Sequence, residues 1–132
     1  MIYLSENSAT RVARLANIPH ENWMQDWPVE VSDPERLDDF TRLLLAHKSD
    51  WELSYWLLDL VLDSAESHLA TTASPERTEQ LIDTLAAVYE ATQAPAIAER
   101  LEYWAALETS DPDEMFRVSP LVREARRRVV TR

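Results

Sequence analysis

The chain has 132 residues, 24 of them acidic and 13 basic, and it contains neither glycine nor cysteine. Without glycine it cannot form the glycine-rich loops that wrap a phosphate in P-loop and dinucleotide-binding proteins. Without cysteine it has no disulfide, thiolate nucleophile or zinc ribbon, so folding must rest on apolar burial. The length suits one domain over residues 1–132.

The first residues and the hydropathy pattern indicate where the protein works. Residues 1–6 carry no basic leader, and no stretch approaches the roughly 20 apolar residues that cross a bilayer. All basic residues except Lys48 are arginine, a bias typical of GC-rich bacterial genomes. We therefore expect a bacterial, cytoplasmic protein without a membrane segment.

Helix-start signals recur along the chain. Residues 32–35 read Ser-Asp-Pro-Glu, a capping box, and Ser49 with Glu52 repeats the arrangement. Four further starts place proline in a first turn, at residues 75, 95, 112 and 120. Apolar residues at helical spacing follow these starts. The predicted helices span residues 6–17, 33–48, 50–70, 75–92, 95–108 and 120–130, with a short turn after Pro112.

These elements predict an all-α fold, because no segment has strand alternation bounded by hairpin turns. We expect a single-domain helical bundle of five to six helices packed as antiparallel hairpins. The triplet Pro-Glu-Arg at 34–36 recurs at 75–77, and this offset aligns Leu60 with Leu101. A period near 40 residues is typical of HEAT-like repeats. The alternative is an irregular bundle without a repeat.

Charge is unevenly distributed along the chain. Residues 21–116 hold twenty-two acids and five bases, whereas residues 117–132 hold one acid and six arginines. The net negative charge of residues 21–116 repels nucleic acid and anionic lipid and attracts basic partners. We therefore expect that the protein binds neither nucleic acid nor membrane. We also expect the acidic residues of 21–116 to neutralise the arginine-rich end.

The segment 51–69 carries the first candidate binding surface. On a helical wheel its apolar residues fill one arc, and four carboxylates and two aromatics share the opposite one. This stripe consists of Glu52, Tyr55, Trp56, Asp59, Asp63 and Glu66. Acidic side chains around an aromatic anchor are typical of a docking surface. The alternative is a solvated polar face with Trp56 tucked under a neighbouring helix.

The second candidate lies in residues 18–30, a long connection without clear periodicity. Trp23, Asp26 and Trp27 would form an aromatic and acidic recognition loop there. The alternative is that the two tryptophans plug one end of the bundle. Both candidates favour a basic protein as the partner.

The sequence carries no catalytic pattern. No carboxylate stands three residues before a histidine, as di-metal bundles require, and a glycine-flanked nucleophile elbow is impossible. We therefore expect no enzymatic activity, cofactor or metal. The chain resembles bacterial immunity proteins in size and composition only, and we expect an immunity-type inhibitor of a basic toxin. The alternatives are a helical-hairpin scaffold that binds a peptide or helix, and a homodimer formed through residues 51–62.

Overall fold

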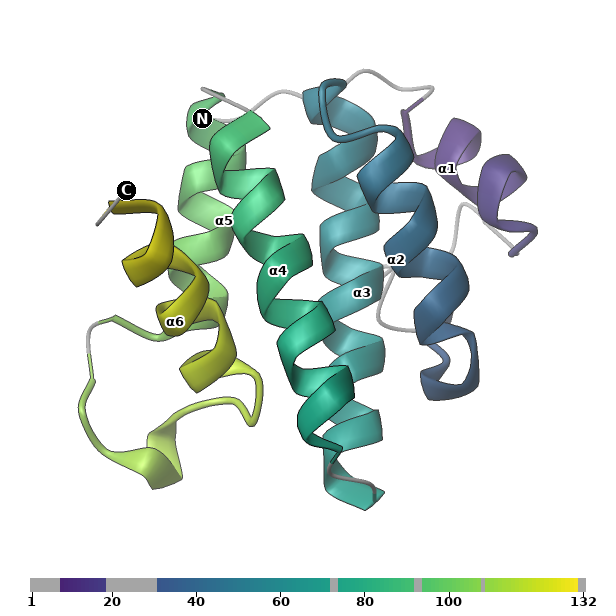
Figure 1. Cartoon of the computed structure of the whole chain (residues 1–132). Helices are drawn as coiled ribbons and strands as arrows, with labels where there is room; N and C mark the ends of the chain where they lie inside the picture. The colour runs from purple at the N-terminus through teal and green to yellow at the C-terminus, as the bar shows by residue number, and fades with distance from the viewer. Residues whose placement is uncertain (1–7, 19–30, 72–73, 92–93, 108, 131–132) are drawn as a thin grey trace.

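The computed structural model describes residues 8–18, 31–71, 74–91, 94–107 and 109–130 (Figure 1). Over these ranges the chain is all-helical, as predicted. The six α-helices are α1 (Ser8–Ala16), α2 (Leu37–Ala46), α3 (Trp51–Thr71), α4 (Pro75–Ala91), α5 (Pro95–Ala105) and α6 (Ser119–Val130). Two short 3-10 helices, η2 (Pro34–Arg36) and η3 (Pro112–Glu114), precede α2 and α6.

The capping residues differ from those predicted at two helix starts. Asp33, not Ser32, caps η2, because its Oδ1 accepts a hydrogen bond from the Glu35 amide at 3.0 Å. Similarly, Asp50 Oδ1 accepts from the Leu53 amide at 3.2 Å. In both places an aspartate follows the serine, and the aspartate carboxylate accepts a hydrogen bond from a free amide of the first helical turn. The sequence thus predicts both helix starts correctly, but it places each capping residue one position too early.

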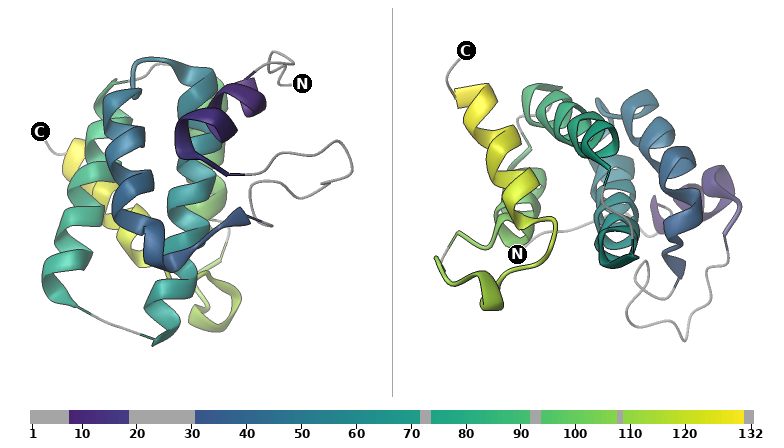
Figure 2. Two further views of the ribbon diagram at one scale, coloured as in Figure 1. Left: turned by 90° about the vertical axis from the view of Figure 1, so that its right-hand side faces the viewer. Right: turned by 60° about the horizontal axis from the view of Figure 1, so that its bottom comes forward.

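The helices form two layers (Figures 1 and 2). Helices α2, α4 and α6 lie in one layer, and α3 and α5 in the other, while α1 packs at one end against α3 and α2. Helices α2 and α3 pack on each other, but α4 makes its most extensive contacts with α6. The two segments that begin with the Pro-Glu-Arg triplets at 34–36 and 75–77 therefore pair their helices differently.

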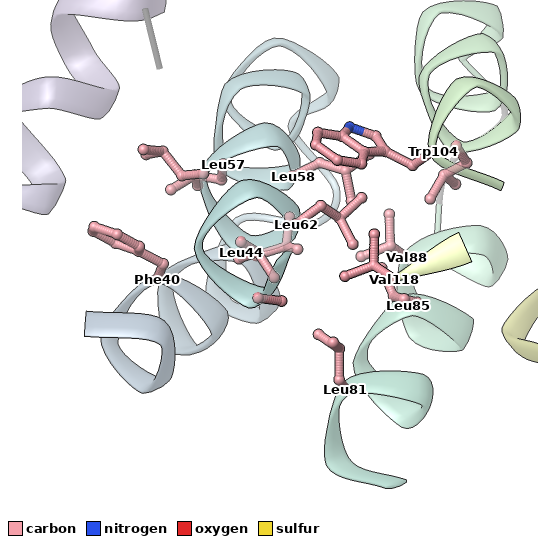
Figure 3. Close-up of a cluster of buried hydrophobic side chains, with 14 of the residues drawn as sticks. Phe40, Leu44, Leu57, Leu58, Leu62, Leu81, Leu85, Val88, Trp104 and Val118 are labelled. Atoms are coloured by element: carbon pink, nitrogen blue, oxygen red, sulfur yellow. The ribbon is translucent and has the colours of Figure 1, made fainter. Parts of the chain in front are cut away.

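Helix α3 is the centre of the fold, because it contacts α1, α2 and α5. Its residues from Leu53 to Ala65 are buried on almost every side, which the helical wheel did not predict. Between the layers they meet side chains of α2 and α4 such as Phe40, Leu44 and Leu85 (Figure 3). The leucines and valine of 53–62, which belong to the alternative dimer surface, thus lie in the core.

Positive backbone φ angles occur at two described residues, Asn17 and Ala106, at 55° and 52°. This left-handed conformation commonly ends a helix, and glycine usually provides it. In this chain without glycine, Ala106 ends α5 in a conformation that costs a residue with a Cβ roughly 1 kcal/mol. Arg123 of α6 secures the end by donating to the carbonyls of Ala105, Ala106 and Thr109.

Candidate acidic binding surface

The predicted acidic stripe of α3 faces neighbouring helices in the structure. Asp59 is 4% exposed, so the expectation that it lies on an exposed surface is wrong. Glu52, Tyr55, Trp56, Asp63 and Glu66 are all half-buried. The reason is the central place of α3, whose polar arc faces α1, α5 and the start of α6 instead of solvent.

Asp59 joins α3 to α5. Its Oδ1 accepts hydrogen bonds from Arg100 Nε at 2.7 Å and from Trp104 Nε1 at 2.9 Å. Burial alone lowers the pKa of Arg100, but the hydrogen bond and charge of Asp59 outweigh it, so the net pKa is raised. This buried aspartate is therefore a structural residue, because removing it would leave a half-buried guanidinium unpaired.

Glu66 and Trp56 have structural partners as well. Glu66 accepts hydrogen bonds from the backbone amides of Arg117 and Val118, at 2.9 and 3.0 Å, and so fixes the start of α6. Trp56 Nε1 donates to Ser8 Oγ at 2.8 Å, which places the indole beneath α1, as the alternative interpretation expected. Asp63 is half-buried, and desolvation raises its pKa even though a hydrogen bond from Ser32 opposes the shift.

The second predicted cluster, Trp23, Asp26 and Trp27, lies outside the described residues. Its role as a recognition loop, or as a plug at the end of the bundle, stays a prediction.

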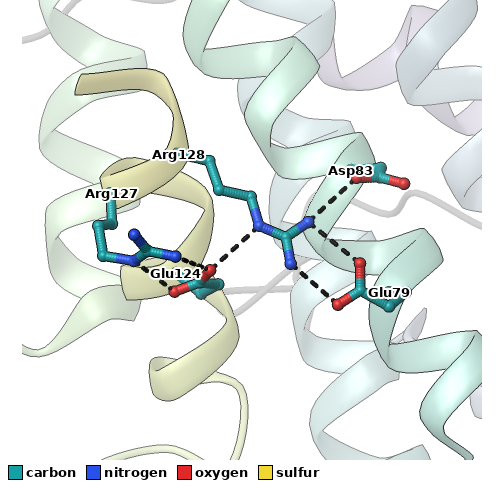
Figure 4. A network of polar contacts seen from close by, with 5 residues as sticks. All are labelled: Glu79, Asp83, Glu124, Arg127 and Arg128. Atoms are coloured by element: carbon teal, nitrogen blue, oxygen red, sulfur yellow. Dashed lines mark hydrogen bonds and ion pairs between the residues drawn. The ribbon is translucent and has the colours of Figure 1, made fainter. Parts of the chain in front are cut away.

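Arg128 of α6 pairs with acidic residues of α4, as expected for an arginine-rich end that the acidic residues of 21–116 neutralise. Arg128 lies between α6 and α4, with its guanidinium 2.9 Å from Glu79, 3.3 Å from Asp83 and 3.1 Å from Glu124 (Figure 4). Hydrogen bonds from Arg127 and Arg128 lower the pKa of Glu124 to about 2. Two acidic side chains of α4, Glu79 and Asp83, thus form ion pairs within the protein.

An exposed acidic surface lies elsewhere, on α5 and the segment that follows it. Its acidic members are Glu99 and Glu102 on α5 and Asp113 and Glu114 on η3, all exposed. Its apolar members are Tyr103, 49% exposed, and Leu107, 42% exposed. We call these six residues the α5–η3 face. Residues 99, 102 and 103 share one side of the helix because they are three and four positions apart.

The Tyr103 ring is held in place at this face. Its centroid lies 5.6 Å from that of Trp104 in an edge-on contact and 5.3 Å from that of Phe116. The Arg100 guanidinium carbon lies 4.5 Å from the same centroid. Phe116 lies two residues after η3, so its contact with Tyr103 ties the segment between η3 and α6 to α5. A half-exposed aromatic fixed on three sides loses little conformational freedom when it binds.

The sequence does contain signals for this face: the spacing of Glu99, Glu102 and Tyr103, and the acidic run at 111–114. A similar spacing of carboxylates and aromatics occurs on α3, so the local pattern alone does not show which of the two helices exposes it. Moreover, the ring contact between Phe116 and Tyr103 joins residues that local periodicity cannot relate.

Comparison with known protein families, curated proteins and solved structures finds no match. Among the described residues, no helix combines the length and apolar character needed to traverse a bilayer. Within the same ranges, no three histidine or carboxylate side chains converge in a way that could hold a metal ion.

Proposed function

We propose that this protein is a non-catalytic, acidic binding module whose α5–η3 face docks on a basic protein. The partner that fits best is a bacterial toxin or effector domain with a cationic active site, which makes the protein an immunity-type inhibitor in the bacterial cytoplasm. The observation that carries the proposal is the fixed, half-exposed Tyr103 ring with Glu99 and Glu102 on the same side of α5.

Physical chemistry supports a protein ligand of positive charge. A net charge of −11 attracts cationic proteins from a distance and speeds their association at low salt. Tyrosine is among the residues that contribute most to binding when neighbours exclude water around it. A toxin that acts on nucleic acid needs a positive site, which carboxylates around an aromatic anchor can occupy.

The test compares two double charge reversals that change the net charge equally. Glu99→Lys with Glu102→Lys alters the α5–η3 face, and Glu35→Lys with Glu76→Lys alters exposed positions on η2 and α4. Partners captured from a lysate of the source organism are identified and purified, and their affinity is measured by calorimetry. We expect the first variant to bind at least about 10-fold more weakly than the second. Equal losses would contradict the proposal.

Tyr103→Ala tests the anchor separately from the charge. We expect it to weaken binding by about 10-fold or more, with little change in the salt dependence of the affinity. Helicity and the melting temperature, measured by circular dichroism, show whether the variant is still folded. A folded variant with wild-type affinity would exclude Tyr103 from the interface.

The second candidate function is a HEAT-like helical-hairpin scaffold that binds a peptide or helix in an apolar groove. The α2–α3 pair favours it, because these two consecutive helices pack on each other as the helices of such a repeat do. Size-exclusion chromatography at low and high salt distinguishes the two. A partner held by charge leaves at high salt, and a partner held in an apolar groove stays.

A further inference from the structure

Two hollows lie at the end of the molecule that carries α1. The first, about 280 Å³, is lined by Arg11, Arg14, Leu15, His47 and Leu53, and the second, about 340 Å³, is lined by Leu15, Arg36, Asp39, Arg42, Leu43 and Ala46. Leu15 lines both and is 44% exposed. We call these two hollows together the α1/α2 groove.

The groove is unusual in this protein because its charged lining is basic. It contains four arginines and one aspartate, although the whole chain has almost twice as many acidic as basic residues. In Figure 1, α1 lies at the opposite end of the layers from α6 and the segment that carries η3. A protein with a negative net charge therefore has a locally basic site at this end.

Three of the four arginines here are less firmly paired than those elsewhere, whereas Arg36 is held by the Ala16 carbonyl, to which it donates a hydrogen bond. Arg42 is 77% exposed and meets Asp39 only at 3.6 Å, and Arg11 meets Asp50 at 3.8 Å. In contrast, Arg100 and Arg128 reach carboxylates at 2.7 and 2.9 Å. No ion pair of Arg14 is found within the described ranges. Long, exposed ion pairs contribute little, so a ligand carboxylate can replace them at small cost.

The floor of the groove is apolar. Leu15 and Leu43 project from two helices that pack on each other, and Ala46 leaves space beside them. An apolar floor between two helices with charged residues at its rim is the arrangement that receives an amphipathic helix. Arginine at the rim adds directed hydrogen bonds to carboxylates of that helix.

We propose that the α1/α2 groove binds an acidic amphipathic helix of a partner protein. The apolar side of that helix contacts Leu15 and Leu43, and its glutamates or aspartates pair with Arg14 and Arg42. This surface is separate from the α5–η3 face and selects a ligand of opposite charge, so the inference does not depend on the proposed function.

The probe is a fluorescently labelled peptide of about 14 residues with leucines at positions i, i+3, i+4 and i+7 and glutamates on its other side. Binding is followed by anisotropy at about 0.15 M salt, which screens the long-range repulsion between the acidic peptide and the acidic protein. We expect Arg14→Glu with Arg42→Glu to weaken binding at least about 10-fold. The matched control is Arg126→Glu with Arg127→Glu, which reverses two exposed arginines on α6, changes the net charge equally and is expected to keep wild-type affinity.

Two further measurements keep the test independent of folding and of general charge effects. Leu15→Ser is expected to weaken binding about 10-fold, whereas Val130→Ser, at a residue 75% exposed, should not. A peptide with lysines in place of the glutamates should bind the Arg14→Glu, Arg42→Glu variant no more weakly than the wild type. The proposal is overturned if the acidic peptide fails to bind at about 1 mM, or binds all folded variants equally.

Discussion

Helices α3 and α5 carry similar local patterns but use them differently. Each has a tyrosine followed by a tryptophan with an edge-on contact between the rings, and each has carboxylates nearby. Helix α3 has helices packed on three sides, so Asp59 is buried and Glu66 binds backbone amides. On α5, Glu99, Glu102 and Tyr103 remain exposed. The position of a helix in the layers, not its own pattern, decides whether its carboxylates stabilise the fold or stay exposed to solvent.

The largest expected difference between the two helices is in stability. We predict that Asp59→Ala lowers the free energy of unfolding by about 3–5 kcal/mol, because it leaves Arg100 half-buried without its partner. Glu102→Ala on α5 should change it by less than about 0.5 kcal/mol. Urea denaturation followed by circular dichroism measures both. If the two substitutions cost the same, Asp59 is not the structural residue described here.

The second comparison pairs Glu66 on α3, which accepts hydrogen bonds, with Glu99 on α5, which is exposed. Glu66→Ala removes the acceptor for two amides at the start of α6, and we expect a loss of about 1–3 kcal/mol. Glu99→Ala removes an exposed side chain and should be nearly neutral. Hydrogen exchange should show faster opening of α6 in the first variant only. Unchanged protection of α6 would refute the assigned role of Glu66.

The end of α5 offers a substitution that should stabilise the fold. Ala106 has a φ of 52°, which glycine adopts without a steric penalty. We predict that Ala106→Gly raises the melting temperature and adds up to about 1 kcal/mol, less the entropy that glycine loses on folding. Ala98→Gly, at an exposed position inside α5, should instead destabilise by a similar amount. A lower melting temperature for Ala106→Gly would contradict the observed backbone conformation.

The smallest effects are expected in the pH dependence. Burial raises the pKa of Asp63 on α3, so its contribution to stability is present at low pH and is lost as the pH rises above its ordinary value of 3.8. Hydrogen bonds from arginine lower the pKa of Glu124 on α6 to about 2, so its contribution is present above 4.5 and is lost between 4.5 and about 2. Carbon-detected NMR titration of the two carboxyl groups should show these opposite shifts. Two ordinary pKa values would contradict both environments.

Much of the fold could be predicted from sequence because its signals are local. Proline and a capping residue mark the helix starts, and the apolar spacing identifies the helices. The fate of the α3 carboxylates could not be predicted, since a helical wheel separates faces but does not show which faces are covered. Glu66 meets residues 51 and 52 positions away, and Asp59 meets partners 41 and 45 positions away. No local pattern carries that information.

We propose that positively charged ligands bind α5 and η3 and leave α3 unaffected. The most direct measurement is an NMR titration of the protein with a lysine-rich peptide that carries one tryptophan. Amide shifts should concentrate on residues 99–107 and 111–114, while residues 55–66 of α3 stay unchanged. Shifts centred on Tyr55, Asp59 and Glu66 with an unaffected α5 would contradict the claim.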